Sequence, residues 1–198
     1  LHRLIRRQRQ MCIRDRSADG IAFDAVTKTE RVPIRVNIPG GFMVYNTLDV
    51  LGAALALGIS LKDSAAVLAK VPHVQGRVEV VPTPGKDYTI LIDYAHTPDS
   101  MVNVLQTVKE FAKGRTVAVF GCGGDRDKTK RPRMGKAAAD WSDFAIVTTD
   151  NPRTEEPAAI IRDILPGFDG SNTPYEVVED RVEAIRWAMD HAQKDDVI

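Results

Sequence analysis

The sequence is poor in cysteine, in long apolar runs and in net charge. Only Cys12 and Cys122 occur in 198 residues, so a disulfide framework is excluded and a reducing cytoplasm fits. No run approaches the roughly 20 apolar residues of a membrane-spanning helix, so membrane insertion is not expected. Basic and acidic residues number 27 each, so no global field favours nucleic acid. Specificity must come from local sites.

What is present is enough for a globular protein. With 43% hydrophobic residues, the chain can bury one sizeable core and part of a second. The arginine-rich residues 1–16 carry a single acid and match nothing that follows. A basic nucleic-acid arm or a targeting peptide are alternatives, but the string resembles translated adapter sequence. We interpret it as a non-native tail and expect it to be poorly ordered.

The next part of the chain has two short strands and two helices. Alternation of apolar and polar residues over Ile21–Ile38 predicts strands, and Pro39–Gly41 then breaks the chain. Alanine- and leucine-rich segments predict helices over Val44–Leu57 and Leu61–Lys70. Neither segment could fold alone, so residues 17–75 are expected to be the end of a larger domain.

Residues 76–198 alternate between strand and helix patterns. Strands are expected at Thr89–Ile92, Thr116–Phe120, Phe144–Val147 and Tyr175–Val178, with a further start at Asp196, and helices at Ser100–Ala112, Met134–Trp141, Pro157–Leu165 and Arg181–Ala192. This order predicts an α/β fold with a doubly wound, mainly parallel sheet. Because the last strand only begins at Asp196, we expect the domain to be incomplete at its end.

Polar residues follow the first of these strands in the motif DYAHTPDS. Asp93 could accept bonds from ribose hydroxyls, Tyr94 could stack on a base and His96 could contact phosphate. Alternatively, Asp93 or Thr97 only caps the following helix, and the histidine is structural. The motif alone leaves both interpretations open.

A glycine-rich loop, GCGGDRDKTKRPRMG, follows the second strand. Its glycines let backbone amides approach a ligand, and five basic residues crowd what we expect to be one loop: Arg126, Lys128, Lys130, Arg131 and Arg133. It is neither a P-loop nor a dinucleotide fingerprint, and a solvated loop is the alternative. Cys122 has no evident base partner, so we expect a small buried residue rather than a nucleophile.

The motif DNPR follows the third strand, at the edge where open α/β sheets bind ligands. Arg153 offers a planar fork of donors to a carboxylate, and Asn151 can both donate and accept. Together with Asp150, they suit an amino-acid end that carries both an amine and a carboxylate. The sequence therefore predicts an amino-acid-binding site here.

In order and spacing, DYAHTP, GCGGDRDKTKRP and DNPR resemble the carboxy-terminal domain of the Mur ligases, in particular the members that add meso-diaminopimelate. The resemblance covers about residues 17–198 and implies a Rossmann-like domain at 76–198, preceded by the end of the central ATP-binding domain. It also implies that meso-diaminopimelate is bound by Asp150, Asn151, Pro152 and Arg153, together with Arg126. Lysine would leave Arg153 unpaired, which explains its rejection.

The resemblance further implies contacts to the nucleotide from Asn46, Arg77, Asp93, Tyr94 and His96, with Arg77 meeting phosphate and Asp93 the ribose. Relatives usually carry asparagine where this chain has Met43, so that polar contact is in doubt. Asn46 could instead be a helix N-cap, and the sequence does not decide between the two roles.

The implied activity is ATP-dependent amide formation in the bacterial cytoplasm. The partners would be ATP with Mg²⁺, meso-diaminopimelate and UDP-N-acetylmuramoyl-L-Ala-D-Glu, and no side-chain nucleophile is required. The chain contains no P-loop, so we expect one upstream and expect this chain alone to be inactive. Two alternatives remain: a sister ligase that adds lysine, which would not be expected to carry DNPR, and a noncatalytic nucleotide- or amino-acid-binding module.

Overall fold

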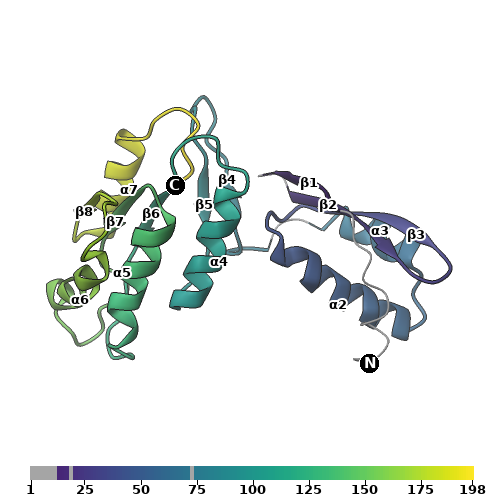
Figure 1. Cartoon of the computed structure of the whole chain (residues 1–198), viewed down its shortest axis with the longest axis horizontal. Coiled ribbons are helices and arrows are strands. Elements are labelled where there is room, and N and C mark those ends of the chain that lie inside the picture. Colours follow the sequence, from purple (N-terminus) through teal and green to yellow (C-terminus); the bar gives the residue numbers. More distant parts are fainter. Residues whose placement is uncertain (1–12, 18–19, 72–73) are drawn as a thin grey trace. The chain divides into compact units, whose positions relative to one another are not determined.

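The computed structural model describes residues 13–17, 20–71 and 74–198 (Figure 1). The chain divides into two compact units, Leu1–Glu79 and Val80–Ile198. The division falls a few residues after the boundary expected between residues 75 and 76. No helix in the described part of the chain is long and apolar enough to cross a membrane.

The first unit contains an antiparallel sheet of three strands, β1 (Ile13–Ser17), β2 (Gly20–Val26) and β3 (Arg31–Val36), with β2 in the centre. Strand β1 departs from the expectation of a poorly ordered tail over residues 1–16, because Ile13, Asp15 and Arg16 pair with residues of β2. Such pairing uses backbone groups and needs no particular side-chain pattern. Residues 1–12 lie outside the described residues.

Two helices, α2 (Phe42–Ala56) and α3 (Leu61–Leu68), complete the first unit. They begin and end within about two residues of the predicted bounds, because Pro39–Gly41 and Gly58 break the chain there. The side chains that form the core of this unit come from β2, β3, the bend after β3 and both helices: Ile21, Phe23, Ala25, Ile34, Val36, Ile38, Val44, Leu51 and Leu61.

The main sheet of the second unit is parallel. Strand β4 (Glu79–Val81) pairs with β5 (Ile90–Ile92), and β6 (Val117–Phe120), β7 (Phe144–Val147) and β8 (Tyr175–Val177) form a parallel sheet in that order. Val197 joins the two groups, since it bridges in parallel to Thr89 beside β5 and to Thr116 beside β6. The strand start expected at Asp196 is therefore found at Val197.

Helices cover both faces of this sheet. They are α4 (Pro98–Lys109), α5 (Lys130–Trp141), α6 (Pro157–Ile164) with the 3₁₀ helix η1 (Leu165–Phe168), and α7 (Arg181–Asp190). Helices α4 and α5 lie side by side (Figure 1) and pack with α6 against the strand side chains of one face. Helix α7 packs Ala184 and Ala188 against Val117 and Ile146 on the other face. The doubly wound α/β fold is thus confirmed.

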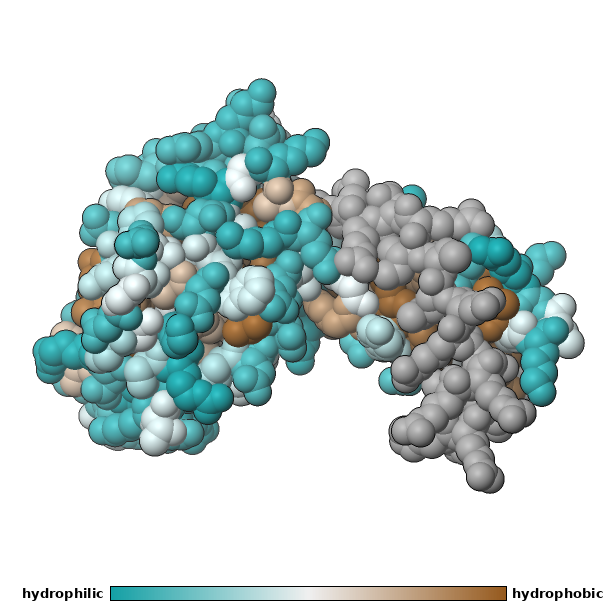
Figure 2. Space-filling model, viewed as in Figure 1, coloured by the Kyte–Doolittle hydropathy of each residue, from teal (hydrophilic) through white to brown (hydrophobic). Residues whose placement is uncertain are grey.

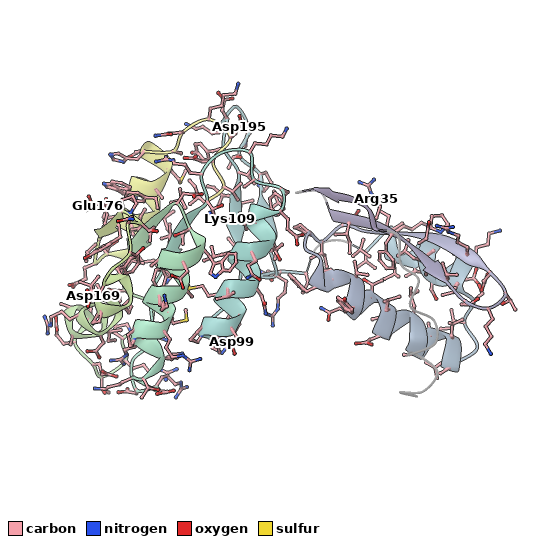
Figure 3. All side chains as sticks on the ribbon, viewed as in Figure 1. Arg35, Asp99, Lys109, Asp169, Glu176 and Asp195 are labelled. Atoms are coloured by element: carbon pink, nitrogen blue, oxygen red, sulfur yellow. The ribbon has the colours of Figure 1, made fainter. Side chains whose placement is uncertain are left out.

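The outer surface of the second unit is mostly hydrophilic in the view of Figure 2. Charged residues such as Asp99, Lys109, Asp169 and Glu176 lie on its helices, loops and strand β8 (Figure 3). The buried apolar residues of α4, α5 and α6 pack on side chains of the sheet, as amphipathic patterning requires.

Candidate functional site

The three predicted motifs follow strands β5, β6 and β7 of the second unit. Because these strands run in the same direction, their carboxyl ends lie at one edge of the sheet. DYAHTP, the glycine loop and DNPR all leave the sheet at this edge.

The glycine loop and the DNPR turn are joined directly. The Gly124 N–H donates to the Asn151 carbonyl over 2.8 Å, and the Arg153 guanidinium donates to the Gly124 carbonyl over 3.2 Å. A side chain at Gly124 would place Cβ 1.9 Å from the Pro152 carbonyl oxygen. Glycine is therefore required at position 124 for the two backbones to meet.

The structure also brings Arg126 and Asp150 close to one glycine, Gly123. A Cβ on Gly123 would lie 4.0 Å from both Arg126 Cγ and Asp150 Oδ2, and 3.7 Å from the Asn151 carbonyl oxygen. Asp150 also accepts a bond from Arg181 at 3.4 Å. The predicted cluster of Arg126, Asp150, Asn151, Pro152 and Arg153 therefore comes from two adjoining loops. Its guanidinium, carboxylate and amide groups can bind a zwitterion.

Each of the two loops contains one residue with left-handed backbone. Asp125 has φ 51° and Arg153 has φ 53°. Non-glycine residues rarely adopt this conformation, and it costs roughly 1–2 kcal/mol in a residue with a side chain. Thr154 holds Asp125 in place, because its hydroxyl donates to Asp125 Oδ1 over 2.7 Å.

The basic segment differs from the expectation of a single loop. Helix α5 begins at Lys130, so Lys130, Arg131 and Arg133 are helical. Pro132 is compatible with this start, because the first turn of a helix does not need its N–H. Arg131 is also not a surface charge: its side chain is completely buried.

Glu155 is the centre of a charged network that sequence reasoning missed. Arg131 donates to both of its carboxylate oxygens, over 2.7 and 3.0 Å, and the Asp125 N–H donates over 2.7 Å. Lys128 Nζ lies 3.1 Å away. The hydrogen bonds from Arg131, followed by that from the Asp125 N–H, lower the pKa of Glu155 to about 2. The only sequence signal was its position directly after DNPRT.

Cys122, the second residue of the glycine loop, is buried, as predicted. Burial raises the pKa of its thiol to about 11. The thiol therefore stays protonated at neutral pH and packs in the core as a small apolar side chain.

In DYAHTP the side chains of Asp93 and His96 bond to backbone groups two residues away. Asp93 Oδ1 accepts from the Ala95 N–H over 2.7 Å, and His96 Nδ1 lies 3.0 Å from the Tyr94 carbonyl oxygen. Thr97 caps α4 in a capping box with Ser100, which confirms the capping interpretation for that residue. Tyr94 is 69% exposed, so its ring is available for stacking.

Asn46 and Arg77 lie in the first unit. Asn46 is not an N-cap, because α2 begins at Phe42 and its N-cap is Gly41. The exposed Asn46 amide instead lies 3.6 Å from Met43 Sδ, one turn earlier. Arg77 is exposed in a turn, where its N–H donates to the Val74 carbonyl.

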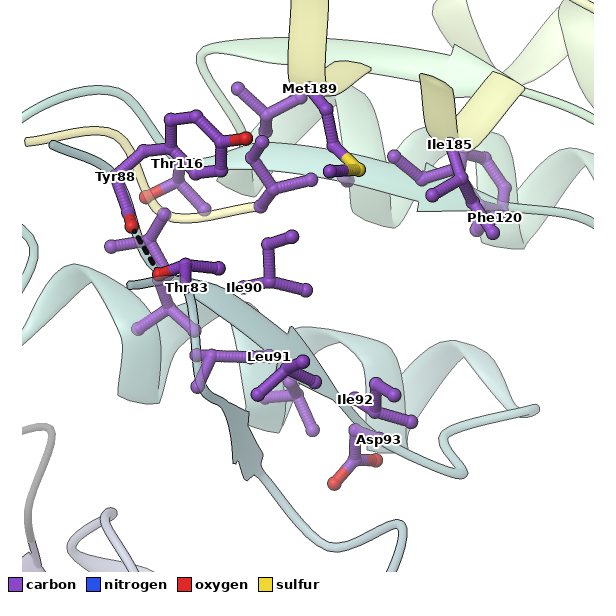
Figure 4. A pocket seen from close by; sticks show the side chains of 18 of the residues that line it. Thr83, Tyr88, Ile90, Leu91, Ile92, Asp93, Thr116, Phe120, Ile185 and Met189 are labelled. Carbon is purple, nitrogen blue, oxygen red and sulfur yellow. Dashed lines mark hydrogen bonds between the residues drawn. The ribbon is translucent and has the colours of Figure 1, made fainter. Parts of the chain in front are cut away.

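An apolar cavity of about 640 Å³ lies between β5 and β6 in the second unit. Ile185 and Met189 of α7 face it from one side, and Leu91 of β5 lies opposite (Figure 4). Asp93 is the one predicted site residue in its lining. The glycine loop and the DNPR turn, which we call the paired loops, do not line this cavity.

Residues 76–198 match the family described as Mur ligase, glutamate ligase domain. The chain belongs to the Mur ligase family. This membership agrees with the resemblance of the three motifs, and it places the paired loops in the ligase domain of the family.

The chain is similar to several curated members of the family. It is 50% identical over 180 residues to the UDP-N-acetylmuramoyl-L-alanyl-D-glutamate–2,6-diaminopimelate ligase of Clostridium botulinum, covering 90% of this chain and 37% of that protein. Identity to the enzyme of the same name from Bacillus cereus is 47% over 182 residues, covering 92% and 36%. The chain thus spans little more than a third of these relatives.

Solved structures agree with the fold. A structure of a UDP-N-acetylmuramoyl-L-alanyl-D-glutamate–2,6-diaminopimelate ligase matches with a TM-score of 0.67 and 36% identity, over 96% of this chain and 40% of that chain. A pseudomurein peptide ligase type C from Methanothermus fervidus matches with a TM-score of 0.70 and 24% identity, over 90% and 36%. The second likeness supports the fold alone.

Proposed function

We propose that this chain supplies the acceptor-amino-acid half of a ligase that adds meso-diaminopimelate to UDP-N-acetylmuramoyl-L-Ala-D-Glu, with ATP as the energy source. The observation that carries the proposal is the direct junction of the glycine loop and DNPR, through the bonds of Gly124 to Asn151 and Arg153. The printed names of the relatives at about half identity support the same substrate.

Recognition would act on the far end of the diamino diacid. Arg126 and Arg153 pair with its distal carboxylate, while Asp150 and the Asn151 side chain bind its distal amine. Pro152 shapes the turn, since its carbonyl packs on Gly124 and accepts the Glu155 N–H over 3.0 Å. Lysine has no distal carboxylate and would leave the two guanidinium groups without an anion.

Five residues contact the nucleotide in this proposal. In the second unit, Asp93 accepts from ribose hydroxyls, Tyr94 stacks on the base and His96 contacts phosphate. In the first unit, Asn46 donates to the nucleotide and Arg77 meets a phosphate. The exposure of Tyr94, Asn46 and Arg77 is consistent with these roles.

The reaction proceeds in two steps. The D-glutamate side-chain carboxylate attacks the γ-phosphorus of ATP, which forms an acyl phosphate and releases ADP. The diaminopimelate amine then attacks the acyl carbon, the amide bond forms, and phosphate and a proton leave. This chain contributes the position of the amine, because binding of the far end directs the reacting end.

Magnesium accompanies ATP in such reactions. Among the described residues, no group of three or more histidine, cysteine, aspartate or glutamate side chains could hold a metal ion. We therefore assign no magnesium ligand to this chain. Since ATP and the UDP-linked substrate are cytoplasmic compounds, the proposed setting is the bacterial cytoplasm.

The substrate is tested by NMR titration of the chain with meso-diaminopimelate and with lysine, a method that measures weak affinities. We expect binding of meso-diaminopimelate, with shifts at Gly123, Gly124 and Asn151, and much weaker binding of lysine. Arg126→Ala should weaken the binding of meso-diaminopimelate and leave that of lysine unchanged. Arg133→Ala, which removes an exposed arginine of α5, is the matched control. Equal affinities for the two amino acids would contradict the assignment.

The ligase activity is tested in a chimaera. Residues 20–198 replace the matching segment of the Clostridium botulinum relative, and ADP release is measured with each amino acid. We expect release that depends on meso-diaminopimelate. A folded chimaera that releases ADP with lysine instead would support the lysine-adding alternative, and one that binds meso-diaminopimelate without turnover would support a noncatalytic module.

A further inference from the structure

Arg131 has the largest completely buried side chain in the described part of the protein. It lies in the first turn of α5 and forks between two acids. The terminal nitrogen Nη1 donates to both Glu155 and Asp163, and the terminal nitrogen Nη2 donates to Glu155 alone. Removing a guanidinium from water is costly, and an apolar residue of similar volume would fill the same space. Complete burial of Arg131 beside two partly exposed carboxylates suggests a role beyond stability.

That reason lies in what Glu155 holds. Glu155 follows Arg153 by two residues in the DNPR turn, and it accepts the N–H of Asp125, the residue before Arg126. The Glu155 carboxylate therefore bonds to the backbone of the glycine loop, and its two bonds from Arg131 fix its position. Thr154 adds a second connection, because its hydroxyl and its N–H both donate to the Asp125 carboxylate. We call Asp125, Arg131, Thr154 and Glu155 the Glu155 clasp.

The clasp includes or adjoins the two residues of these loops that have left-handed backbone. Asp125 belongs to the clasp, and Arg153 is bonded to Gly124, directly before it. Left-handed residues persist only where their surroundings determine their conformation. A relaxed Asp125 or Arg153 would turn the arginine on its loop in a different direction. The clasp therefore bonds together the residue before Arg126 and the residue after Arg153.

We propose that Glu155, held by buried Arg131, is a positioning residue that sets Arg126 and Arg153 at the spacing required by the distal carboxylate of meso-diaminopimelate. This inference rests on the proposed function. It adds a specificity determinant that itself touches no substrate. Glu155 acts through the Asp125 N–H on one loop and through its own place in the DNPR turn on the other.

The test compares two substitutions that each remove one carboxylate from Arg131. Glu155→Gln also weakens the bond to the Asp125 N–H, whereas Asp163→Asn, in α6, touches neither loop. Affinities for meso-diaminopimelate and lysine are measured by NMR titration of the whole chain, with thermal unfolding of each variant as a check on folding. A merely structural role would change both affinities by the same factor.

We expect Glu155→Gln to weaken meso-diaminopimelate binding about tenfold, as loss of a charge-assisted bond predicts. Lysine binding should change less than about twofold, and Asp163→Asn should leave both affinities within about twofold. Equal effects of the two substitutions, or equal effects of Glu155→Gln on the two ligands, would overturn the positioning role.

A double substitution separates action through Arg153 from an independent effect. If Glu155 works by placing Arg153, adding Glu155→Gln to Arg153→Ala should weaken binding by a smaller factor than it does in the unaltered chain. Multiplicative effects of Glu155→Gln with both Arg153→Ala and Arg126→Ala overturn the proposal. Should Glu155→Gln fail to fold, Thr154→Val opens the clasp without touching Arg131, and it must weaken meso-diaminopimelate selectively.

The outcomes distinguish this inference from the proposed function. An unaltered chain that binds lysine as well as meso-diaminopimelate contradicts the proposed function, and the selectivity role of Glu155 falls with it. A selective unaltered chain whose selectivity survives Glu155→Gln contradicts the positioning role alone.

Discussion

The paired loops after β6 and β7 and the DYAHTP segment after β5 lie at the same edge of one sheet, but they are held in different ways. Bonds between the paired loops join residues 29 or 30 positions apart, such as Arg153 to Gly124 and Asp125 to Glu155. In DYAHTP the bonds of Asp93, His96 and Thr97 span two or three positions. The amino-acid side of the edge is therefore fixed by tertiary contacts and the DYAHTP side chiefly by local ones.

The difference suits the chemistry proposed for each side. Discrimination between two amino acids that differ by one carboxylate requires donors placed in advance, because adjustment of the donors would admit both ligands. A base or ribose can be met by an exposed aromatic ring and a carboxylate at the end of a strand.

Breaking the junction of the paired loops should have the largest effect. Gly124→Ala would place Cβ 1.9 Å from the Pro152 carbonyl oxygen, so one backbone must move. We expect a loss of about 3 kcal/mol in the free energy of unfolding, as for other overpacked sites, and loss of meso-diaminopimelate binding. Urea unfolding and NMR titration measure the two effects.

Gly123→Ala is the matched control. Its Cβ would meet nothing closer than the Asn151 carbonyl oxygen at 3.7 Å, an ordinary contact. The free energy of unfolding should change by less than about 1 kcal/mol. If the two substitutions were equally destabilising, the close approach at Gly124 would not be what joins the loops.

The sequence predicted the elements of this comparison but not the connection between them. Periodicity located β7 and both ends of α3 within about two residues, and α4 begins two residues before the predicted start at Ser100. The motifs placed Arg126 and Arg153 on neighbouring loops. Burial of Arg131 could not be predicted, since its partner Glu155 lies 24 residues later and basic runs are usually solvated.

The acid stability of the second unit should depend on Glu155. Its pKa is about 2 in the folded chain, below the ordinary 4.5, so the unfolded chain binds a proton that the folded chain excludes. The stabilisation is complete above pH 4.5 and is lost as the pH falls towards 2. Glu155→Gln should therefore flatten the dependence of unfolding free energy on pH in this window, measured by urea unfolding at each pH.

Asp127 and Asp196 also have lowered pKa values, but both residues are present in the unaltered protein and in the Glu155→Gln variant. The difference between the two curves thus reports Glu155. Parallel curves between pH 4.5 and 2 would show that the clasp contributes nothing to the charge-dependent stability of the paired loops.

On the DYAHTP side, the largest structural contribution comes from a helix cap. Thr97→Ala removes the hydroxyl that accepts the Ser100 N–H at the start of α4. We expect a loss of about 1 kcal/mol in unfolding free energy, the usual effect of removing an N-cap. Affinity for meso-diaminopimelate should not change. A parallel loss of affinity would mean that the two sides are not held independently.

The smallest effect is expected where the two sides touch. Lys130, the first residue of α5, donates from Nζ to the His96 carbonyl over 2.9 Å. Lys130→Met removes this bond and keeps most of the side-chain stem, so unfolding free energy should fall by about 0.5 kcal/mol. Hydrogen exchange should quicken at Ala95 and Thr97 but not at Gly124 and Asp125. Because the paired loops have their own tertiary bonds, faster exchange there would show that their geometry depends on the DYAHTP segment after all.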